Sequence, residues 1–377
     1  MAPQPTVLIF GGVGFIGRNF VAHLVENGLA GQIRVVDKVL PQTAYLNERF
    51  KSAFSKVNFM QGDLSNTIPP EKFQNIFKRE DNSSFDYVIN FASETKLSQP
   101  AEIYNDRIYK LSINCAQEAA KRGVKVFVQV STADVYEPTA TPSKEDSKTA
   151  PWNALAAAKL KVDEELLNMP GLNVVIVRPA VVYGIGSLTG LTPRLICGRV
   201  YQQEKKTMEL LWDGDRKINT VHVHDVVRAI WHSANWYVGS DNPDQGGKII
   251  FNLADQNKTD QEAINAHIRS IFGIQTEYKG NGFSAEAEKD DAEDAVEESN
   301  DLHMGPWYKL LKNQDIKNSP LTPYLDKESL FIRELSVDGS KICISTGFQY
   351  EHPKLTEASL REIITDFQTL NIWPKDQ

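Results

Sequence analysis

The chain has 377 residues, 41% of them hydrophobic and 24% charged, and its 41 basic and 49 acidic side chains leave a net charge of −8. This acidic balance argues against nucleic-acid binding, which needs clustered positive charge. The three cysteines are odd in number and widely spaced, which argues against a disulfide framework and a zinc site. No apolar run reaches the length of a membrane span or a signal-peptide core, so we expect a soluble, cytoplasmic protein that does not bind membranes.

Short apolar runs alternate with amphipathic segments along the first two thirds of the chain. β-branched runs without polar alternation predict parallel strands covered on both faces. The predicted strands are Val7–Phe10, Ile33–Val36, Val57–Met60, Tyr87–Phe91, Val126–Val130, Val174–Val177 and Ile249–Leu253. The predicted helices between them include Asn19–Glu26, Tyr109–Lys121 and Ala154–Leu167.

The pattern changes after Pro179, where a glycine-containing loop precedes short helices at Thr192–Gln203, Gln261–Phe272 and Leu355–Leu370. The whole pattern predicts an α/β protein, with a Rossmann-like doubly wound parallel sheet and a smaller C-terminal substrate lobe. We assign residues 1–180 and 212–255 to the nucleotide-binding part, and residues 181–211 and 256–377 to the lobe.

One segment of the lobe, residues 286–298, carries eight carboxylates against Lys289 alone, which accounts for −7 of the net charge of −8. A solvated loop or an exposed helix is one interpretation. A regulatory or partner-binding segment is the other.

A glycine loop, Gly11-Gly12-Val13-Gly14-Phe15-Ile16-Gly17, directly follows the first predicted strand and opens a helix. Gly11 permits the tight turn, Gly14 lets the backbone approach a pyrophosphate, and Gly17 allows the helix to pack closely on the strand. The free N–H groups at the start of the helix favour phosphate. Because a strand precedes the loop and a helix follows it, the pattern predicts a dinucleotide site.

Asp37 ends the second strand 20 residues after Gly17, where a carboxylate can accept hydrogen bonds from an adenosine ribose. A 2′-phosphate there would meet a like charge, so NAD is favoured over NADP. Because Lys38 lies next to Asp37, NADP remains an alternative cofactor.

Taken together, these motifs resemble the extended short-chain dehydrogenase/reductase family, also called the NAD-dependent epimerase/dehydratase family. The motifs that follow the glycine loop, in the family's order, are Asp63-Leu64, Ile89–Thr95, Asn114, Ser131–Tyr136, Arg178-Pro179 with Tyr183-Gly184, and Val221–Asp225. The resemblance implies an NAD cofactor. It implies that the cofactor contacts Gly11, Gly14, Phe15, Ile16, Gly17, Asp37, Asp63, Leu64, Phe91, Ala92, Ser93, Asn114, Lys159 and Pro179.

The family's chemistry uses Tyr-x-x-x-Lys on one helix face, with the tyrosine moving a proton while nicotinamide moves the hydride. Lys159 matches the lysine, but the position of the tyrosine is Leu155, which cannot carry a proton. The resemblance assigns Thr132 to the hydroxyl that contacts the reacting oxygen. Asp134 and Glu94 are the other candidate acids or bases. No metal is expected, because His222 and His224 have no third ligand at motif spacing.

The substrate stays open. Nucleotide-sugar members of the family carry an arginine at the position of Ile218, and an apolar residue there is closer to the sterol-dehydrogenase branch. A sugar-nucleotide-like compound and another small alcohol or ketone are both retained as substrates.

These residues leave two main functions open. One is NAD-dependent hydride transfer with a non-standard proton carrier, and the other is a catalytically impaired NAD(H)-binding pseudoenzyme that acts as a sensor, scaffold or assembly component. RNA binding is a third interpretation, against which the acidic surplus argues. Helices over 104–121 and 154–167 correspond to the pair that forms dimer interfaces in the family, so we expect a homodimer.

Overall fold

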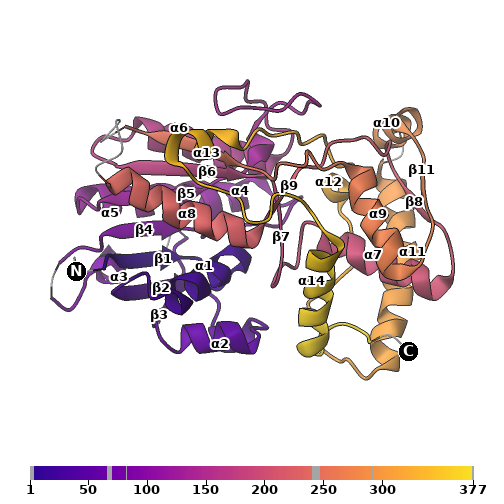
Figure 1. The fold of residues 1–377 in the computed structure, drawn as a ribbon, viewed down its shortest axis with the longest axis horizontal. Coiled ribbons are helices and arrows are strands. Elements are labelled where there is room, and N and C mark those ends of the chain that lie inside the picture. The colour runs from indigo at the N-terminus through magenta and orange to yellow at the C-terminus, as the bar shows by residue number, and fades with distance from the viewer. Residues whose placement is uncertain (1–3, 66–69, 82, 240–246, 291, 376–377) are drawn as a thin grey trace.

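A computed structural model describes residues 4–65, 70–81, 83–239, 247–290 and 292–375. Its centre is a seven-stranded parallel sheet in the order β10-β6-β5-β4-β1-β2-β3 (Figure 1). The strands are β1 (Thr6–Phe10), β2 (Gln32–Asp37), β3 (Asn58–Gln61), β4 (Tyr87–Asn90), β5 (Val126–Val130), β6 (Val174–Pro179) and β10 (Ile249–Leu253). Each lies within one or two residues of its predicted bounds, and the Rossmann-like fold class is confirmed.

Alternate residues of the strands face opposite layers of helices. Val7 and Ile9 of β1 belong to one buried cluster, and Leu8 and Phe10 belong to the other. The first layer contains α1 (Phe15–Glu26), α2 (Glu48–Phe54), α8 (Val223–Val238) and α13 (Ser340–Thr346). The second contains α3 (Pro70–Phe77), α5 (Leu111–Lys121) and α6 (Ala154–Asn168), with α4 (Ala101–Tyr104) and a π-helical turn (Asn105–Lys110) leading into α5. The order of the strands reverses between β1 and β4, so a crevice opens at their carboxyl ends.

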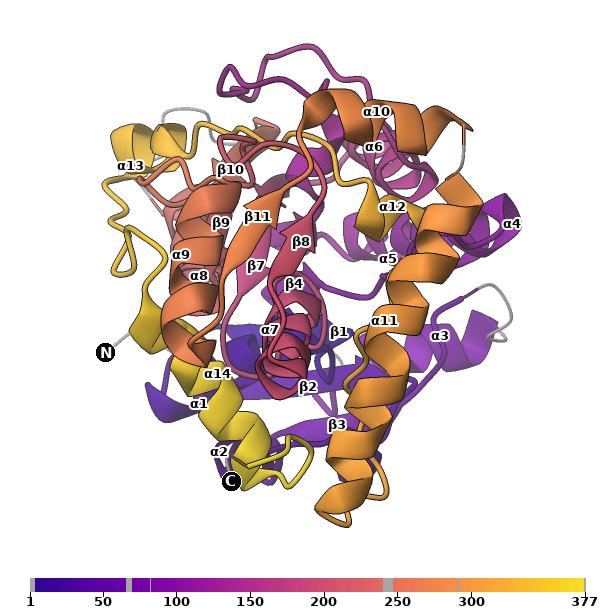
Figure 2. The ribbon, with the colours of Figure 1, turned by 90° about the vertical axis from the view of Figure 1, so that its right-hand side faces the viewer.

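The lobe has its own apolar core beside those strand ends (Figure 2). Its helices are α7 (Thr192–Glu204), α9 (Gln261–Phe272), α10 (Asn281–Asp290), α11 (Ala292–Asn313), α12 (Lys327–Leu330) and α14 (Glu357–Thr369). Two small parallel pairs accompany them, β7 (Val181–Tyr183) with β9 (Thr220–His222) and β8 (Met208–Leu210) with β11 (Thr276–Tyr278).

The acidic segment 286–298 lies on α10 and α11, apart from Asp291, which lies outside the described residues. The segment around α13, which the sequence placed in the lobe, packs on the sheet through Ile342 and Phe348. Within the described part of the chain, no helix is both long and apolar enough for a membrane crossing.

Four histidines meet where the lobe joins the sheet. The His222 ring stacks on that of His352 with centroids 3.9 Å apart, while His224 lies 5.5 Å from His352 and 6.1 Å from His23 of α1. Burial, then the neighbouring His352 and His224, lowers the pKa of His222 to about 3. Burial, then His224, lowers the pKa of His23 to about 4. Charged groups around the cluster are Glu26, Arg49, Asp225, Arg228 and Glu351.

We expect the free energy of unfolding to fall as the pH is lowered from about 7 to about 5. His222 has its ordinary pKa near 6.5 in the unfolded chain, so the unfolded chain takes up a proton first. The stability that His222 contributes is complete above that pH and is lost progressively toward pH 3. At pH 5 the free energy of unfolding has already fallen by about 2 kcal/mol. Urea unfolding of His222→Gln should show a weaker pH dependence. His267→Gln on α9, outside the cluster, should keep the full dependence, and equal behaviour of the two variants would contradict this account.

Candidate active site

A continuous cleft of about 2030 Å³ follows the carboxyl ends of the strands and extends between the sheet and the lobe. With one exception, every residue expected to contact the cofactor lines it, namely Gly11, Gly14, Phe15, Ile16, Gly17, Asp37, Asp63, Leu64, Phe91, Ala92, Ser93, Lys159 and Pro179. The candidate chemical residues Thr132, Asp134 and Glu94 line it too, as does Leu155. The sheet topology therefore brings residues from six strand ends and two helices into one site.

The glycine loop forms a cradle whose shape depends on missing side chains. Gly11 has a φ of +70°, and a Cβ atom there would lie 2.6 Å from the amide nitrogen of Ala92. A Cβ on Gly17 would lie 2.6 Å from Cα of Gly12, so α1 could not pack on the loop. Gly14 caps α1 without a side-chain hydrogen bond, which leaves the helix N–H groups free. This backbone fits a pyrophosphate at a helix N-terminus.

Arg18 adds a fixed positive charge beneath the loop, and sequence reasoning missed it. Its Nε donates to the carbonyl oxygens of Val13 at 3.0 Å and Gly14 at 3.3 Å, and its side chain is buried yet borders the cleft. Burial lowers its pKa to about 10, so the guanidinium is still charged at neutral pH. The available signal was a basic residue in the first turn of the helix that follows the glycine loop.

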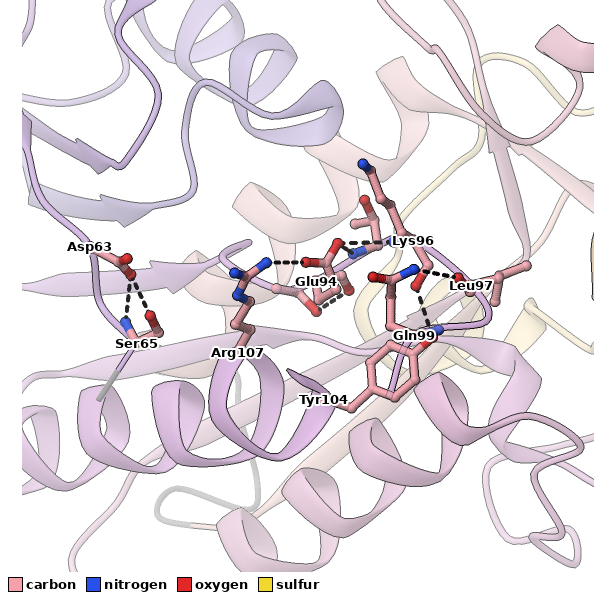
Figure 3. Close-up of polar contacts among 10 residues, drawn as sticks. Asp63, Ser65, Glu94, Lys96, Leu97, Gln99, Tyr104 and Arg107 are labelled. Atoms are coloured by element: carbon pink, nitrogen blue, oxygen red, sulfur yellow. Dashed lines mark hydrogen bonds and ion pairs between the residues drawn. The ribbon is translucent and has the colours of Figure 1, made fainter. Parts of the chain in front are cut away.

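Asp37 and Asp63 mark the adenosine end of the cleft. The N–H groups of Val13 and Val39 donate to the two oxygens of Asp37 at 2.9 and 3.0 Å, which fixes the carboxylate while leaving it further lone pairs. Asp63 accepts two hydrogen bonds from Ser65 at 2.9 and 2.6 Å (Figure 3). Burial alone would raise the pKa of Asp63, but the bonds from Ser65 bring it below its ordinary value.

Lys159 and Leu155 lie one turn apart on α6 and both line the cleft. Asn153 caps this helix by accepting a hydrogen bond from the N–H of Ala156 at 2.7 Å. Lys159 Nζ donates to the carbonyl of Val130 at 3.2 Å. Burial lowers the pKa of Lys159 to about 8, against the attraction of nearby carboxylates.

Leu155 packs against the apolar cluster of the second helix layer, so its position offers no proton donor or acceptor. In the described part of the cleft the lining tyrosines are Tyr45 after β2, Tyr201 on α7 and Tyr324 before α12. Tyr136, from the same motif as Thr132, is buried and bonded to Asn252. None of these four lies on α6.

Asp134 lies beside Thr132 and is the nearest acid to it. The Thr132 hydroxyl donates to Asp134 Oδ2 at 3.3 Å, and Trp152 Nε1 donates to Oδ1 at 3.4 Å. Burial raises the pKa of Asp134, while Trp152, Thr132 and Lys159 act in the opposite direction. A carboxyl group whose pKa is raised toward neutrality is suited to both taking up and releasing a proton.

A buried ion pair holds α6 against the sheet. Asp163, one turn after Lys159, accepts from Arg178 Nε and from the Ser131 hydroxyl, both at 2.9 Å. Arg178 also donates to the Tyr136 hydroxyl at 3.0 Å, and both charged side chains are buried. Burial alone would lower the pKa of Arg178, but the attraction of Asp163 raises it. The pair thus fixes Lys159 relative to the ends of β5 and β6.

Glu94 is held in structure rather than free in the cleft. Arg107 donates to its Oε2 at 3.0 Å, and the N–H groups of Thr95 and Lys96 donate to Oε1 (Figure 3). Burial alone would raise the pKa of Glu94, but these hydrogen bonds lower it. The same loop reaches the lobe, because the N–H and hydroxyl of Ser98 donate to Glu328 at 2.5 and 2.6 Å.

Asn114 is the exception among the expected cofactor contacts. It is exposed on α5 and does not border the cleft, which Arg107 and Leu111 border instead. The predicted helix over 104–121 is interrupted by the π-helical turn, which changes the register in which the following residues present their side chains.

Asp163→Asn should destabilise the fold, because it leaves the buried Arg178 charge without its partner. We expect a loss of about 3–5 kcal/mol in the free energy of unfolding, measured by urea denaturation. Glu164→Gln, which neutralises the exposed neighbour on the same helix, should leave stability within about 0.5 kcal/mol. A loss as small for Asp163→Asn as for the control would show that the pair does not hold α6.

Known proteins give the context for this geometry. The model of the NAD dependent epimerase/dehydratase family matches residues 7–254. A bifunctional UDP-glucose 4-epimerase and UDP-xylose 4-epimerase of Pisum sativum is 31% identical over 173 residues, 44% of this chain and 47% of that protein. The chain thus spans about half the length of this curated relative. An uncharacterised protein of Schizosaccharomyces pombe is 25% identical over 70% of this chain and 80% of its own length.

Solved structures share the fold. The UDP-N-acetylglucosamine 4-epimerase of Methanobrevibacter ruminantium superimposes with a TM-score of 0.67 at 17% identity, over 97% of this chain and 99% of that one. The dTDP-glucose 4,6-dehydratase of Bacillus anthracis, solved with NAD, gives 0.67 at 18% identity over 97% of both chains. Because the family model matches about two thirds of its length, the chain belongs to the NAD-dependent epimerase/dehydratase family.

Proposed function

We propose that the chain binds NAD(H) and transfers a hydride to or from a small alcohol or ketone, whether sugar-nucleotide-like or not, with Thr132 and Asp134 carrying the proton. The observation that supports this most directly is the buried Asp134 carboxyl, hydrogen-bonded to Thr132 in the cleft that Lys159 also borders. It offers a proton carrier where Leu155 leaves no phenol.

The chain's own residues suit such a cofactor. The glycine cradle and Arg18 would hold the pyrophosphate, and Asp37 would accept from the adenosine ribose. Lys159, fixed by the carbonyl of Val130, would donate to the nicotinamide ribose. Bound NAD would supply the hydride acceptor, or donor when reduced.

Thr132 can pass a proton because a hydroxyl donates and accepts at once. Its Oγ1 donates to Asp134 Oδ2. A substrate hydroxyl placed against Oγ1 would therefore give its proton to Thr132, and Thr132 would release its own proton to Asp134. In the reverse direction the protonated Asp134 returns it. At neutral pH, below its pKa of about 8, Lys159 is mostly protonated and would stabilise negative charge on the reacting oxygen.

Asp134→Asn should lower kcat/KM by about 10²–10⁴, because an amide keeps the hydrogen bond but cannot take up a proton. The affinity for NADH, measured by fluorescence titration, should be unchanged. NAD reduction would be followed at 340 nm with a panel of sugar nucleotides and small alcohols. Asp146→Asn, an exposed carboxylate in the next loop, serves as the control. Equal activity of both variants would rule out Asp134 as the carrier.

The second candidate is an NAD(H)-binding pseudoenzyme, a sensor, scaffold or assembly component, and Leu155 is the observation that favours it. Leu155→Tyr separates the two functions, since it restores a phenol one turn before Lys159. A pseudoenzyme should gain turnover from none, whereas an enzyme that uses Asp134 should lose activity as the new ring crowds Thr132. Leu155→Phe supplies the ring without the hydroxyl. A gain in both variants would contradict the role of the phenol.

A further inference from the structure

The lobe presents a row of carboxylates to the cleft. Glu286 and Asp290 on α10, and Asp294 and Glu298 on α11, all line it at intervals of four residues, which places each pair on one face of its helix. Figure 2 shows α10, α11 and α12 together on one side of the lobe. Of these four, Asp290 has a loose contact of 3.8 Å with Lys289, and within the described residues the other three form no ion pair. We call these four residues the acidic row.

The cations on the same wall are already partnered. Arg333 is bonded to Glu288 at 2.7 Å, and Lys279 to Glu209 at 2.7 Å. Arg194 donates to Gln261 at 3.1 Å and to Asn265 at 3.3 Å. These amide oxygens leave the charge of Arg194 uncompensated, but the four carboxylates of the acidic row outnumber it, so the net charge of this wall is negative.

Two buried polar groups beside the acidic row have no partner. Trp212 is 4% exposed and His303 6%, both line the cleft, and Trp212 Nε1 and His303 Nδ1 make no hydrogen bond in the described structure. Trp212 packs against Ala292, with Ala287 and Ala295 at the edge of that cluster, so its indole lies under the helices that carry the row. A buried donor without an acceptor costs free energy until a ligand supplies one.

We propose that this end of the cleft takes a substrate with a positively charged amine next to hydroxyl or carbonyl oxygens, such as an amino sugar or amino alcohol. The acidic row would bind the ammonium group, and an oxygen would accept from Trp212 Nε1. Tyr324, an exposed aromatic residue on the same cleft, adds a face that attracts an organic cation, whereas the Phe283 ring already has Lys279 Nζ 5.8 Å from its centroid. The proposal rests on the proposed function and narrows its substrate class.

Two other ligand classes fit less well. A diphosphate would meet the unpaired carboxylates, while Lys279 and Arg333 are bonded to carboxylates and Arg194 to amide oxygens. A metal ion needs several ligands converging on one point, and the described residues hold no group of three or more His, Cys, Asp or Glu side chains that could bind one. An ammonium group tolerates the spread of the row, because its attraction to carboxylates is not confined to one coordination geometry.

Ligand-observed NMR tests this substrate class. It would measure the binding of glucosamine, N-acetylglucosamine and UDP-glucose to the NADH-loaded protein. The two amino sugars differ in whether the nitrogen is charged. Glucosamine should bind more tightly than N-acetylglucosamine by about tenfold, and added salt should reduce the difference. The double variant Asp294→Asn with Glu298→Gln should abolish the preference. Glu293→Gln with Glu362→Gln, an equal charge change at exposed positions outside the cleft, should keep it.

No glucosamine binding, or equal affinity for the two amino sugars, would overturn the proposal, as would tighter binding of UDP-glucose. These outcomes are separate from failure of the proposed function. A protein that binds glucosamine but never NADH would retain this site and lose the oxidoreductase. A protein that oxidises other alcohols but shows no preference for the amine would keep the oxidoreductase function and lose the amine site.

Discussion

The buried pair of Asp163 and Arg178 is the interaction on which the site's geometry depends. Arg178 lies near the end of β6, Asp163 lies on α6, and Ser131 follows β5, so one carboxylate joins three elements. Through Tyr136 the network reaches Asn252 on β10. An ion pair in a core adds little net stability over apolar packing, because desolvation offsets the attraction, but its partners must stay together. Here that requirement fixes the helix bearing Leu155 and Lys159.

The cleft has two ends of different character. At the cofactor end the loop backbone, the start of α1 and Arg18 present positive potential to phosphates. At the lobe end the four carboxylates of the acidic row present negative potential. Between them Lys159, Thr132 and Asp134 border the space where a reaction would take place. The chain thus has the fold of its family, while its function depends on the side chains that the fold places in the cleft.

The sheet could be predicted because each strand is a short buried run whose composition alone indicates parallel pairing. The glycine loop could be predicted because its spacing reflects backbone contacts, as at Gly11 and Gly17. Arg18 and the partnership of Asp163 with Arg178 could not, since they depend on which residues distant in sequence meet. The π-helical turn before α5 leaves no clear mark in composition, so the sequence did not indicate that Asn114 would lie exposed and away from the cleft. The sequence located the acidic segment but not the direction its carboxylates face.

The path of the chain between its two parts limits how they can move. The chain leaves the sheet after β6, returns with α8, leaves again after β10, comes back with α13 and ends in the lobe with α14. Any movement of the lobe relative to the sheet must therefore bend all of these crossings together. For the same reason, neither part can be excised as one uninterrupted piece of polypeptide.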